Sequence, residues 1–224
     1  MRQLLVRLFL LCPLPPHQSI IRWAVHPIHN HIGNINLQNR FNVKTNKFPN
    51  FHTAGLLNHL EWLMQLSNTM DKLITFGCGG SEPFALLWIL GASEIKVVEK
   101  DANRLTKPME ELELLKRQYP TTYKQDTVDF IIADMSAPLP QIPSDYFELA
   151  FCESVLYYME KDIEVLQRAI NQMARVVRPG GWIIVIEHGI EQREINQMFG
   201  AAGLMLVTCP QAPPSSYCFK KAVA

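Results

Sequence analysis

The residues best suited to chemistry form a glycine-rich turn between two apolar segments. The stretch Leu73-Ile-Thr-Phe-Gly-Cys-Gly-Gly-Ser-Glu-Pro83 starts with an apolar run and then has glycine at three of four positions. Glycine tolerates positive φ and lets a ligand come close to the backbone. Ser81 and Pro83 suit the start of a helix, where free N–H groups attract an anionic or polar ligand. A ligand-binding turn and an ordinary strand-to-helix turn both fit this stretch.

Three acidic residues follow apolar segments further along the chain. Glu99 comes 20 residues after Gly79 and closes a β-branched run. An acid at the carboxyl end of a neighbouring strand can accept hydrogen bonds from both ribose hydroxyls of a nucleoside. A surface carboxylate at a strand end is the simpler alternative. Asp134 and Glu153 end two later apolar runs in the same way.

Seven strands and five helices are predicted to position these residues. The strands cover 73–76, 94–99, 128–133, 147–152, 182–186, 204–208 and 217–221. The helices cover 53–66, 84–90, 102–119 with a break before Pro108, 162–177 and 191–202, with a tight stop at 178–181. Alternating strands and helices indicate a parallel sheet covered on both faces, and the last two strands indicate an antiparallel hairpin.

The predicted sheet places the ligand. In an open sheet of this type, ligands bind beyond the carboxyl ends of the strands. We therefore expect Gly77, Glu99, Asp134 and Glu153 to meet in one crevice.

Charge divides the chain unevenly. Residues 1–60 contain six Lys or Arg and no acid, since the first of the 21 acidic residues is Glu61. Such a segment is typical of a basic arm for an anionic partner or of a targeting sequence. We expect residues 1–52 to form a basic N-terminal segment, a lid or targeting arm, and residues 53–224 to form the main domain.

Cysteine and histidine usage argues against a disulfide framework and a metal site. The five cysteines are scattered without a CxxC pair, which favours a reducing, cytoplasmic setting unless the N-terminal segment targets the chain elsewhere. His26, His29 and His31 do not share a helical face, and no nearby Cys, Asp or Glu completes a ligand set. The apolar run at 8–12 is too short to span a membrane.

Over about residues 53–224, the chain resembles the class I S-adenosylmethionine-dependent methyltransferases. The resemblance implies a Rossmann-like, doubly wound α/β fold whose mostly parallel seven-stranded sheet ends in an antiparallel hairpin. It also implies S-adenosylmethionine as cofactor and S-adenosylhomocysteine as product. The matching stretches are 74–81, 97–100, 131–135, 147–156 and 177–187.

The resemblance also assigns residues to the cofactor. Gly77 and Gly79 would pass under its methionine part, and Glu99 would hold the ribose. Asp134 would bind the adenine amino group with Met135 beside the ring. Cys152 or Glu153 would border the transferred methyl. The full set of implied cofactor positions is Phe76, Gly77, Cys78, Gly79, Glu99, Lys100, Asp134, Met135, Cys152 and Glu153.

Two positions depart from the family pattern. The family usually has an acid where this chain has Thr75, and a third glycine where it has Ser81. Loss of the acid would weaken contact with the methionine ammonium or shift that role to Glu153. A non-catalytic S-adenosylmethionine-binding protein is therefore an alternative.

Methyl transfer from S-adenosylmethionine, the reaction that the resemblance implies, requires little acid–base chemistry from the protein. The methyl group is already activated, so the protein aligns the nucleophile and excludes water. A general base is needed only for a protonated nucleophile, and the candidates are His188, Tyr158 and Glu153. A solvated histidine at a strand end explains His188 equally well.

The acceptor is the least determined feature. A nicotinamide cofactor is disfavoured, because Glu82 occupies the third glycine of Gly-x-Gly-x-x-Gly. We expect a small-molecule acceptor, with an acidic metabolite suggested by the basic N-terminal segment. RNA is the alternative, because bases and aromatics alternate at Arg22-Trp23, Arg40-Phe41 and Lys47-Phe48. The sequence leaves the oligomeric state open.

Overall fold

The computed structural model describes residues 70–77, 92–118, 120, 127–208 and 215–223. The predicted helices over 53–66 and 84–90 lie outside these residues, as does the basic segment 1–52. Cys78, Gly79 and Ser81 also lie outside them.

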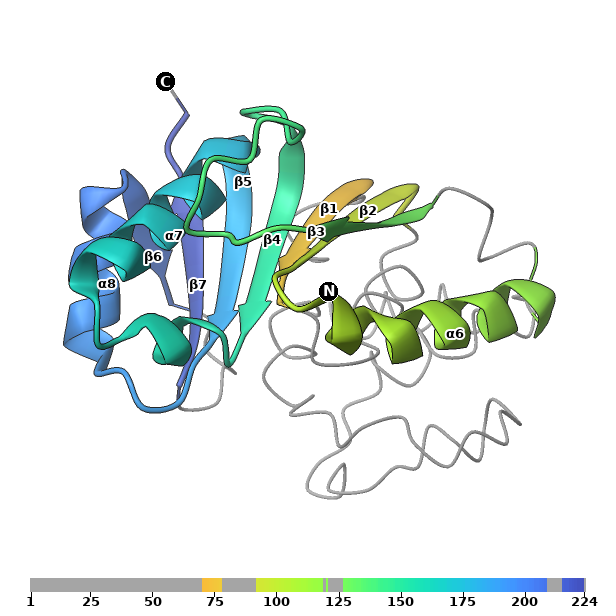
Figure 1. Cartoon of the computed structure of the whole chain (residues 1–224). Helices are drawn as coiled ribbons and strands as arrows, with labels where there is room; N and C mark the ends of the chain where they lie inside the picture. The colour runs from red at the N-terminus through yellow and green to blue at the C-terminus, as the bar shows by residue number, and fades with distance from the viewer. Residues whose placement is uncertain (1–69, 78–91, 119, 121–126, 209–214, 224) are drawn as a thin grey trace, which may run out of the picture. The chain divides into compact units, whose positions relative to one another are not determined.

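Within the described residues, seven strands form one sheet in the order β3-β2-β1-β4-β5-β7-β6 (Figure 1). The neighbours from β3 to β5 pair in parallel, and β7 pairs antiparallel with both β5 and β6. This topology confirms the predicted α/β fold with its C-terminal antiparallel hairpin. The strands are β1 Lys72–Phe76, β2 Glu94–Glu99, β3 Val128–Ile132, β4 Phe147–Glu153, β5 Val177–Ile186, β6 Leu204–Val207 and β7 Ser216–Lys221.

The described helices cover the sheet in two groups. They are α6 Ala102–Gln118, the 3-10 helix η2 Leu156–Met159, α7 Ile163–Val176 and α8 Gln192–Ala201. Buried residues of α7 and α8 join those of β1, β4, β5 and β7 in one apolar cluster. The buried Leu105 and Leu112 of α6 lie outside that cluster. Right-handed crossovers from β2 to β3 and from β4 to β5 place α6 and α7 on opposite faces.

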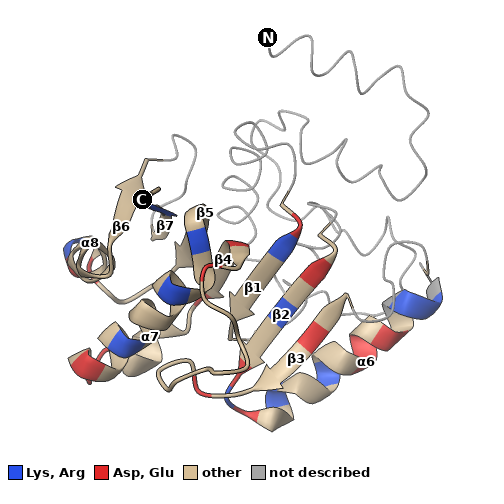
Figure 2. Cartoon of the chain, turned by 90° about the horizontal axis from the view of Figure 1, so that it is seen from above, with Lys and Arg blue, Asp and Glu red and all other residues tan. Residues whose placement is uncertain are grey.

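Helix α6 is continuous through Pro108, so the predicted break before this proline is wrong. Leu105 and Leu112 are both buried and anchor the turns on either side of Pro108. Their burial offsets the missing N–H of the proline. Acidic and basic residues mark the same helix in Figure 2, and ion pairs such as Lys116–Glu113 support its solvated face.

The segment after α7 differs from its prediction. Helix α7 ends at Val176, but β5 starts at once with Val177 rather than at Trp182. Val177 pairs with Phe147 and Trp182 pairs with Leu149, so the extra residues of β5 form a bulge. Gly180 has a φ of +75°, a conformation that glycine adopts without strain. The Pro-Gly-Gly sequence therefore shapes a bulged strand and not a stop before one.

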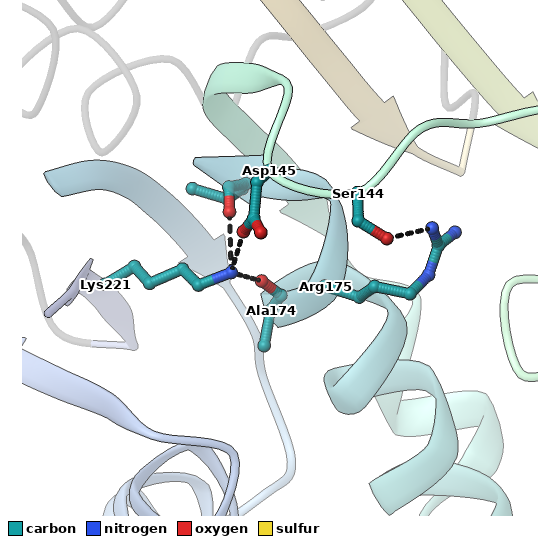
Figure 3. A network of polar contacts seen from close by, with 6 residues as sticks. Ser144, Asp145, Ala174, Arg175 and Lys221 are labelled. Carbon is teal, nitrogen blue, oxygen red and sulfur yellow. Dashed lines mark hydrogen bonds and ion pairs between the residues drawn. The ribbon is translucent and has the colours of Figure 1, made fainter. Parts of the chain in front are cut away.

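Two cationic side chains, Lys221 and Arg175, make hydrogen bonds near the amino-terminal ends of β4 and β5 (Figure 3). Lys221 Nζ donates to Asp145 Oδ1 at 2.6 Å and to the carbonyls of Ala174 and Val177 at 2.8 and 2.9 Å. A cation at this point satisfies carbonyls at the C-terminus of α7. These contacts tie β7 to α7.

Arg175 ties α7 to the segment between β3 and β4. Its Nη1 donates to the Ile142 carbonyl at 2.9 Å and to Ser144 Oγ at 3.0 Å, and its Nη2 donates to the Leu139 carbonyl at 3.1 Å. Asp134 and Met135, two of the predicted cofactor residues, lie near the start of this segment. Arg175 therefore holds the loop that carries them.

Candidate functional site

The predicted cofactor residues that the structure describes lie along one edge of the sheet, whereas Cys78 and Gly79 lie outside the described residues. The register pairs Phe76 with Val98 on one side and with Cys152 on the other, and pairs Glu99 with Ile132. The carboxyl ends of β3, β2, β1 and β4 are thus direct neighbours (Figure 1). The residues that follow these ends, including Gly77 and Asp134, lie at this edge as expected. We call it the carboxyl edge.

Gly77 needs to be glycine for two structural reasons. Its φ is +81°, and its N–H donates to the Val98 carbonyl at 2.8 Å. A Cβ added at Gly77 would lie 2.3 Å from Val155 Cγ2, far inside contact distance. Gly77 therefore allows the turn after β4 to pack directly against the turn after β1.

Glu99 is a buried carboxylate at the end of β2. Its exposed fraction is 6%, and its Oε1 accepts a hydrogen bond from the Asp101 amide at 2.9 Å. Burying a carboxylate is costly unless it is hydrogen-bonded. Its position matches that predicted for a ribose-binding acid.

Asp134 is already engaged by two neighbours. Its Oδ2 lies 2.7 Å from Lys100 Nζ, and its Oδ1 accepts from the amide and hydroxyl of Ser136 at 2.9 and 2.7 Å. Partial burial alone would raise the pKa of Asp134. The hydrogen bonds from Lys100 and Ser136 outweigh that effect and lower its pKa from 3.8 to about 2. Asp134 is therefore a fixed anion at the carboxyl edge.

Three predicted cofactor residues have core side chains. Phe76, Met135 and Cys152 are all buried in the apolar cluster that α7 and α8 share with the sheet. Burial raises the pKa of the Cys152 thiol well above its usual value, and the nearby Glu187 and Glu153 carboxylates add to the rise. Cys152 is thus a neutral, enclosed thiol. Of these residues, the backbone is the part suited to ligand contact.

The candidate acid–base residues lie in the loops that follow β4 and β5. Tyr158 is 72% exposed, His188 is exposed and Glu153 is partly exposed. Tyr157 stands edge to face with Tyr158, with ring centroids 5.9 Å apart. A Cβ added at Gly189 would lie 2.6 Å from the Tyr157 ring, so that ring packs on the backbone beside His188. The two loops thus meet beyond the carboxyl edge.

Glu187 is a residue that the sequence reasoning missed. It is 1% exposed, and its Oε2 accepts hydrogen bonds from the amides of Val155 at 3.1 Å and Leu156 at 2.9 Å. Its Oε1 makes no hydrogen bond in the described part of the chain. Burial raises the pKa of Glu187, while the nearby amides oppose the rise. An acid directly after an all-apolar strand is the sequence signal that could have drawn attention to it.

Thr75 lies on the sheet face opposite the α7–α8 cluster, because its neighbours Ile74 and Phe76 belong to that cluster. It is 1% exposed, and its Oγ1 has no hydrogen-bond partner among the described residues. The position where the resemblance implies an acid thus holds a buried hydroxyl here.

Comparison with protein families places the chain. Residues 74–185, half of its length, match the family described as "Methyltransferase domain". The chain belongs to this family, and it is an S-adenosylmethionine-dependent methyltransferase. The match confirms the predicted family and cofactor.

Solved structures share the fold at low identity. A methyltransferase in complex with the Trm112 methyltransferase activator from Haloferax volcanii has a TM-score of 0.58 and 12% identity, covering 77% of this chain and 91% of that one. The N-methyltransferase NodS from Bradyrhizobium japonicum has a TM-score of 0.53 and 15% identity, covering 73% and 94%. The [4+2]-cyclase SpnF has a TM-score of 0.54 and 14% identity, covering 75% and 82%.

These neighbours carry different chemistry on one architecture, so the fold does not identify the acceptor. A comparison with curated proteins found no match. Among the described residues, no helix has the length and apolar character needed to cross a bilayer, and no group of His, Cys, Asp or Glu is arranged to hold a metal ion.

Proposed function

We propose that this enzyme transfers a methyl group from S-adenosylmethionine to a small-molecule acceptor at the carboxyl edge. The observation that carries the proposal is the placement of Gly77, Glu99 and Asp134 at the ends of three adjacent parallel strands. Ligands of this fold class bind beyond such ends.

The described residues fit an adenosine at this edge. Glu99 offers a buried carboxylate oriented by the Asp101 amide, as recognition of ribose hydroxyls requires. Asp134 Oδ2 would accept a hydrogen bond from the adenine amino group once Lys100 Nζ has moved away from it. Lys100 is 76% exposed, and an exposed ion pair rearranges at little cost.

On the methionine side, Gly77 offers a close backbone approach and Glu153 offers a carboxylate. Because Thr75 cannot supply the usual negative charge, we assign the ammonium contact to Glu153 at the end of β4. The bound cofactor supplies a methyl group activated by its sulfonium. The protein then has to align the acceptor and keep water out.

The acceptor side is built from the loops after β4 and β5. Tyr158 and His188 are exposed there, and Glu153 borders them in sequence. One of these three would take the proton of an acceptor that arrives protonated. Aromatic faces and polar groups at a loop junction suit a compact organic acceptor.

The N-terminal segment completes the proposal. We assign residues 1–52 to a lid over the acceptor and residues 53–224 to the catalytic domain, and the basic lid favours an acidic acceptor. Within the described part of the chain, Cys152 and Cys218 are buried and are not joined to each other in a disulfide, which suits a reducing compartment such as the cytoplasm.

Calorimetric titration of the full chain with S-adenosylmethionine, S-adenosylhomocysteine and NAD tests the cofactor. We expect binding of the first two and none of NAD. Turnover of S-adenosylmethionine is then measured against a panel of acidic metabolites and against RNA. Binding without turnover of any acceptor would indicate a non-catalytic protein, and turnover with RNA alone would replace the small-molecule acceptor.

A further inference from the structure

Glu187 is an unusual group for the place it occupies. It directly follows the apolar strand β5 and is 1% exposed. Among the described residues it forms no ion pair with a Lys or Arg, so its hydrogen bonds must offset the cost of its burial. Those bonds go to two consecutive backbone amides of another element, Val155 and Leu156.

These amides stand at the start of η2, directly after β4. Val155 is the N-cap residue of η2 and has no side-chain hydrogen bond of its own for capping. The first amides of a helix lack intrahelical partners, so Glu187, directly after β5, supplies the acceptor that the N-cap lacks. Ser154, the preceding residue, has a φ of +51°, and its amide donates to the Ile186 carbonyl at 2.9 Å. The end of β5 thus holds a strained turn in place.

The same turn contacts the proposed cofactor edge. The Val155 side chain packs against Gly77 so closely that a Cβ on Gly77 would reach to 2.3 Å of Val155 Cγ2. The residue whose amide Glu187 holds is therefore the residue that rests on the turn after β1. A displacement of Val155 would move directly against Gly77.

Helix η2 extends the connection to the acceptor side. Its Tyr157 ring packs on Gly189, two residues after Glu187. The segment whose amides Glu187 holds thus contacts the turn after β1 through Val155 and the turn after β5 through Tyr157.

We infer that Glu187 is a positioning residue for cofactor binding, which holds the turn after β4 in register with Gly77 at the carboxyl edge. This inference rests on the proposed cofactor site. Both hydrogen bonds to the turn after β4 go to Oε2, and Oε1 has no hydrogen-bond partner among the described residues. Replacing Glu187 by Gln therefore removes the charge while an acceptor oxygen can stay in place of Oε2.

The test compares two substitutions at Glu187 with matched ones at Glu148. Glu148 Oε2 likewise accepts from two consecutive amides, those of Asp71 and Lys72, but at the start of β1. Variants Glu187→Leu, Glu187→Gln, Glu148→Leu and Glu148→Gln are titrated with S-adenosylhomocysteine by calorimetry. Their thermal unfolding is recorded without ligand.

We expect Glu187→Leu to raise the dissociation constant for S-adenosylhomocysteine about tenfold or more, because it leaves two amides without an acceptor. Glu187→Gln keeps an acceptor oxygen and should stay within about threefold of the parent protein. Glu148→Leu should lower the unfolding temperature but leave the dissociation constant within about twofold. A folded Glu187→Leu variant with the parent dissociation constant would overturn the inference.

A double-mutant cycle decides the case if Glu187→Leu does not fold. Glu187→Ser, whose side chain is too short to reach the amides of Val155 and Leu156, and Val155→Ala are measured singly and together in the same titration. Positioning through Val155 requires coupled effects on the dissociation constant, whereas strictly additive effects overturn it.

Glu99→Ala, titrated alongside, separates the inference from the proposed site. If Glu99→Ala binds as tightly as the parent protein, the proposed site and this inference both fail. If Glu99→Ala weakens binding and folded Glu187→Leu does not, the inference alone fails.

Discussion

Lys100 and Asp134 form an ion pair that links the loops after β2 and β3, with 2.7 Å between Lys100 Nζ and Asp134 Oδ2. The residue proposed to meet adenine is therefore held by a basic neighbour before any ligand arrives. Ser136 holds the other oxygen through its amide and hydroxyl. The pair keeps a charged carboxylate at the carboxyl edge and fixes its direction.

The ion pair predicts the acid titration of Asp134. In Lys100→Met, the pKa of Asp134 should rise from about 2 toward 3.8, because the lysine that lowers it is gone. The hydrogen bonds from Ser136 remain and should limit the rise. Because the folded-state pKa is lowered, the pair stabilises the protein above pH 3.8 and loses that effect as the pH falls through about 2. The stability difference at neutral pH should be at most roughly 1 kcal/mol, because Lys100 is largely exposed.

Carbon-detected NMR of the Asp134 carboxyl during acid titration measures this shift. Lys116→Met serves as the control, because Lys116 pairs with Glu113 on α6 and not with Asp134. An Asp134 pKa that stays near 2 in Lys100→Met would show that Ser136 alone lowers it.

Glu99 should be the strongest single contributor to cofactor affinity. Glu99→Ala would remove the two charge-assisted hydrogen bonds proposed to the ribose and should weaken S-adenosylmethionine binding by more than ~1 kcal/mol. Calorimetry measures the change, with Glu113→Ala on the exposed side of α6 as the control. An unchanged dissociation constant in Glu99→Ala would remove this residue from the site.

Gly77→Ala tests the contact between two turns. The new Cβ would collide with Val155 Cγ2 and would also be strained at a φ of +81°. We expect a loss of roughly 1–3 kcal/mol in the free energy of unfolding, measured by urea denaturation.

The double variant Gly77→Ala with Val155→Ala separates the two causes. It relieves the collision but not the backbone strain, so it should recover part of the loss beyond what the single variants predict. No recovery would mean that backbone conformation alone demands glycine at this position.

Removal of residues 1–50 tests the proposed lid. The shortened enzyme should show a raised KM for the acceptor, with cofactor affinity within about twofold of the parent protein. Steady-state kinetics and calorimetry together distinguish the two effects. Unchanged kinetics for the acceptor would argue against a lid.

Much of the fold was predictable because its strands are short β-branched or apolar runs in the sequence. The second strand was predicted at its observed bounds, and Glu99 was placed at its end. Pro108 misled the prediction, because helix propensity ignores the burial of Leu105 and Leu112 on either side. The start of β5 was misplaced because Pro-Gly-Gly resembles a turn until the bulge against β4 is known.

The positions at the carboxyl edge were predictable from strand order, since parallel strands end at the same side. Glu187 was not predicted as part of the site, because its two hydrogen bonds reach residues 31 and 32 positions away. Contacts of that range depend on the final packing of β4 beside β5. Such long-range contacts cannot be predicted from the periodicity of the sequence.

The position of β7 between β5 and β6 affects folding during translation. Strand β6 leaves the ribosome before β7 and cannot pair until β7 arrives between it and β5. A nascent chain that stops before residue 216 would expose two unpaired strand edges, and such edges invite aggregation. Stalled or truncated translation products of this enzyme should therefore depend on chaperones far more than the finished chain does.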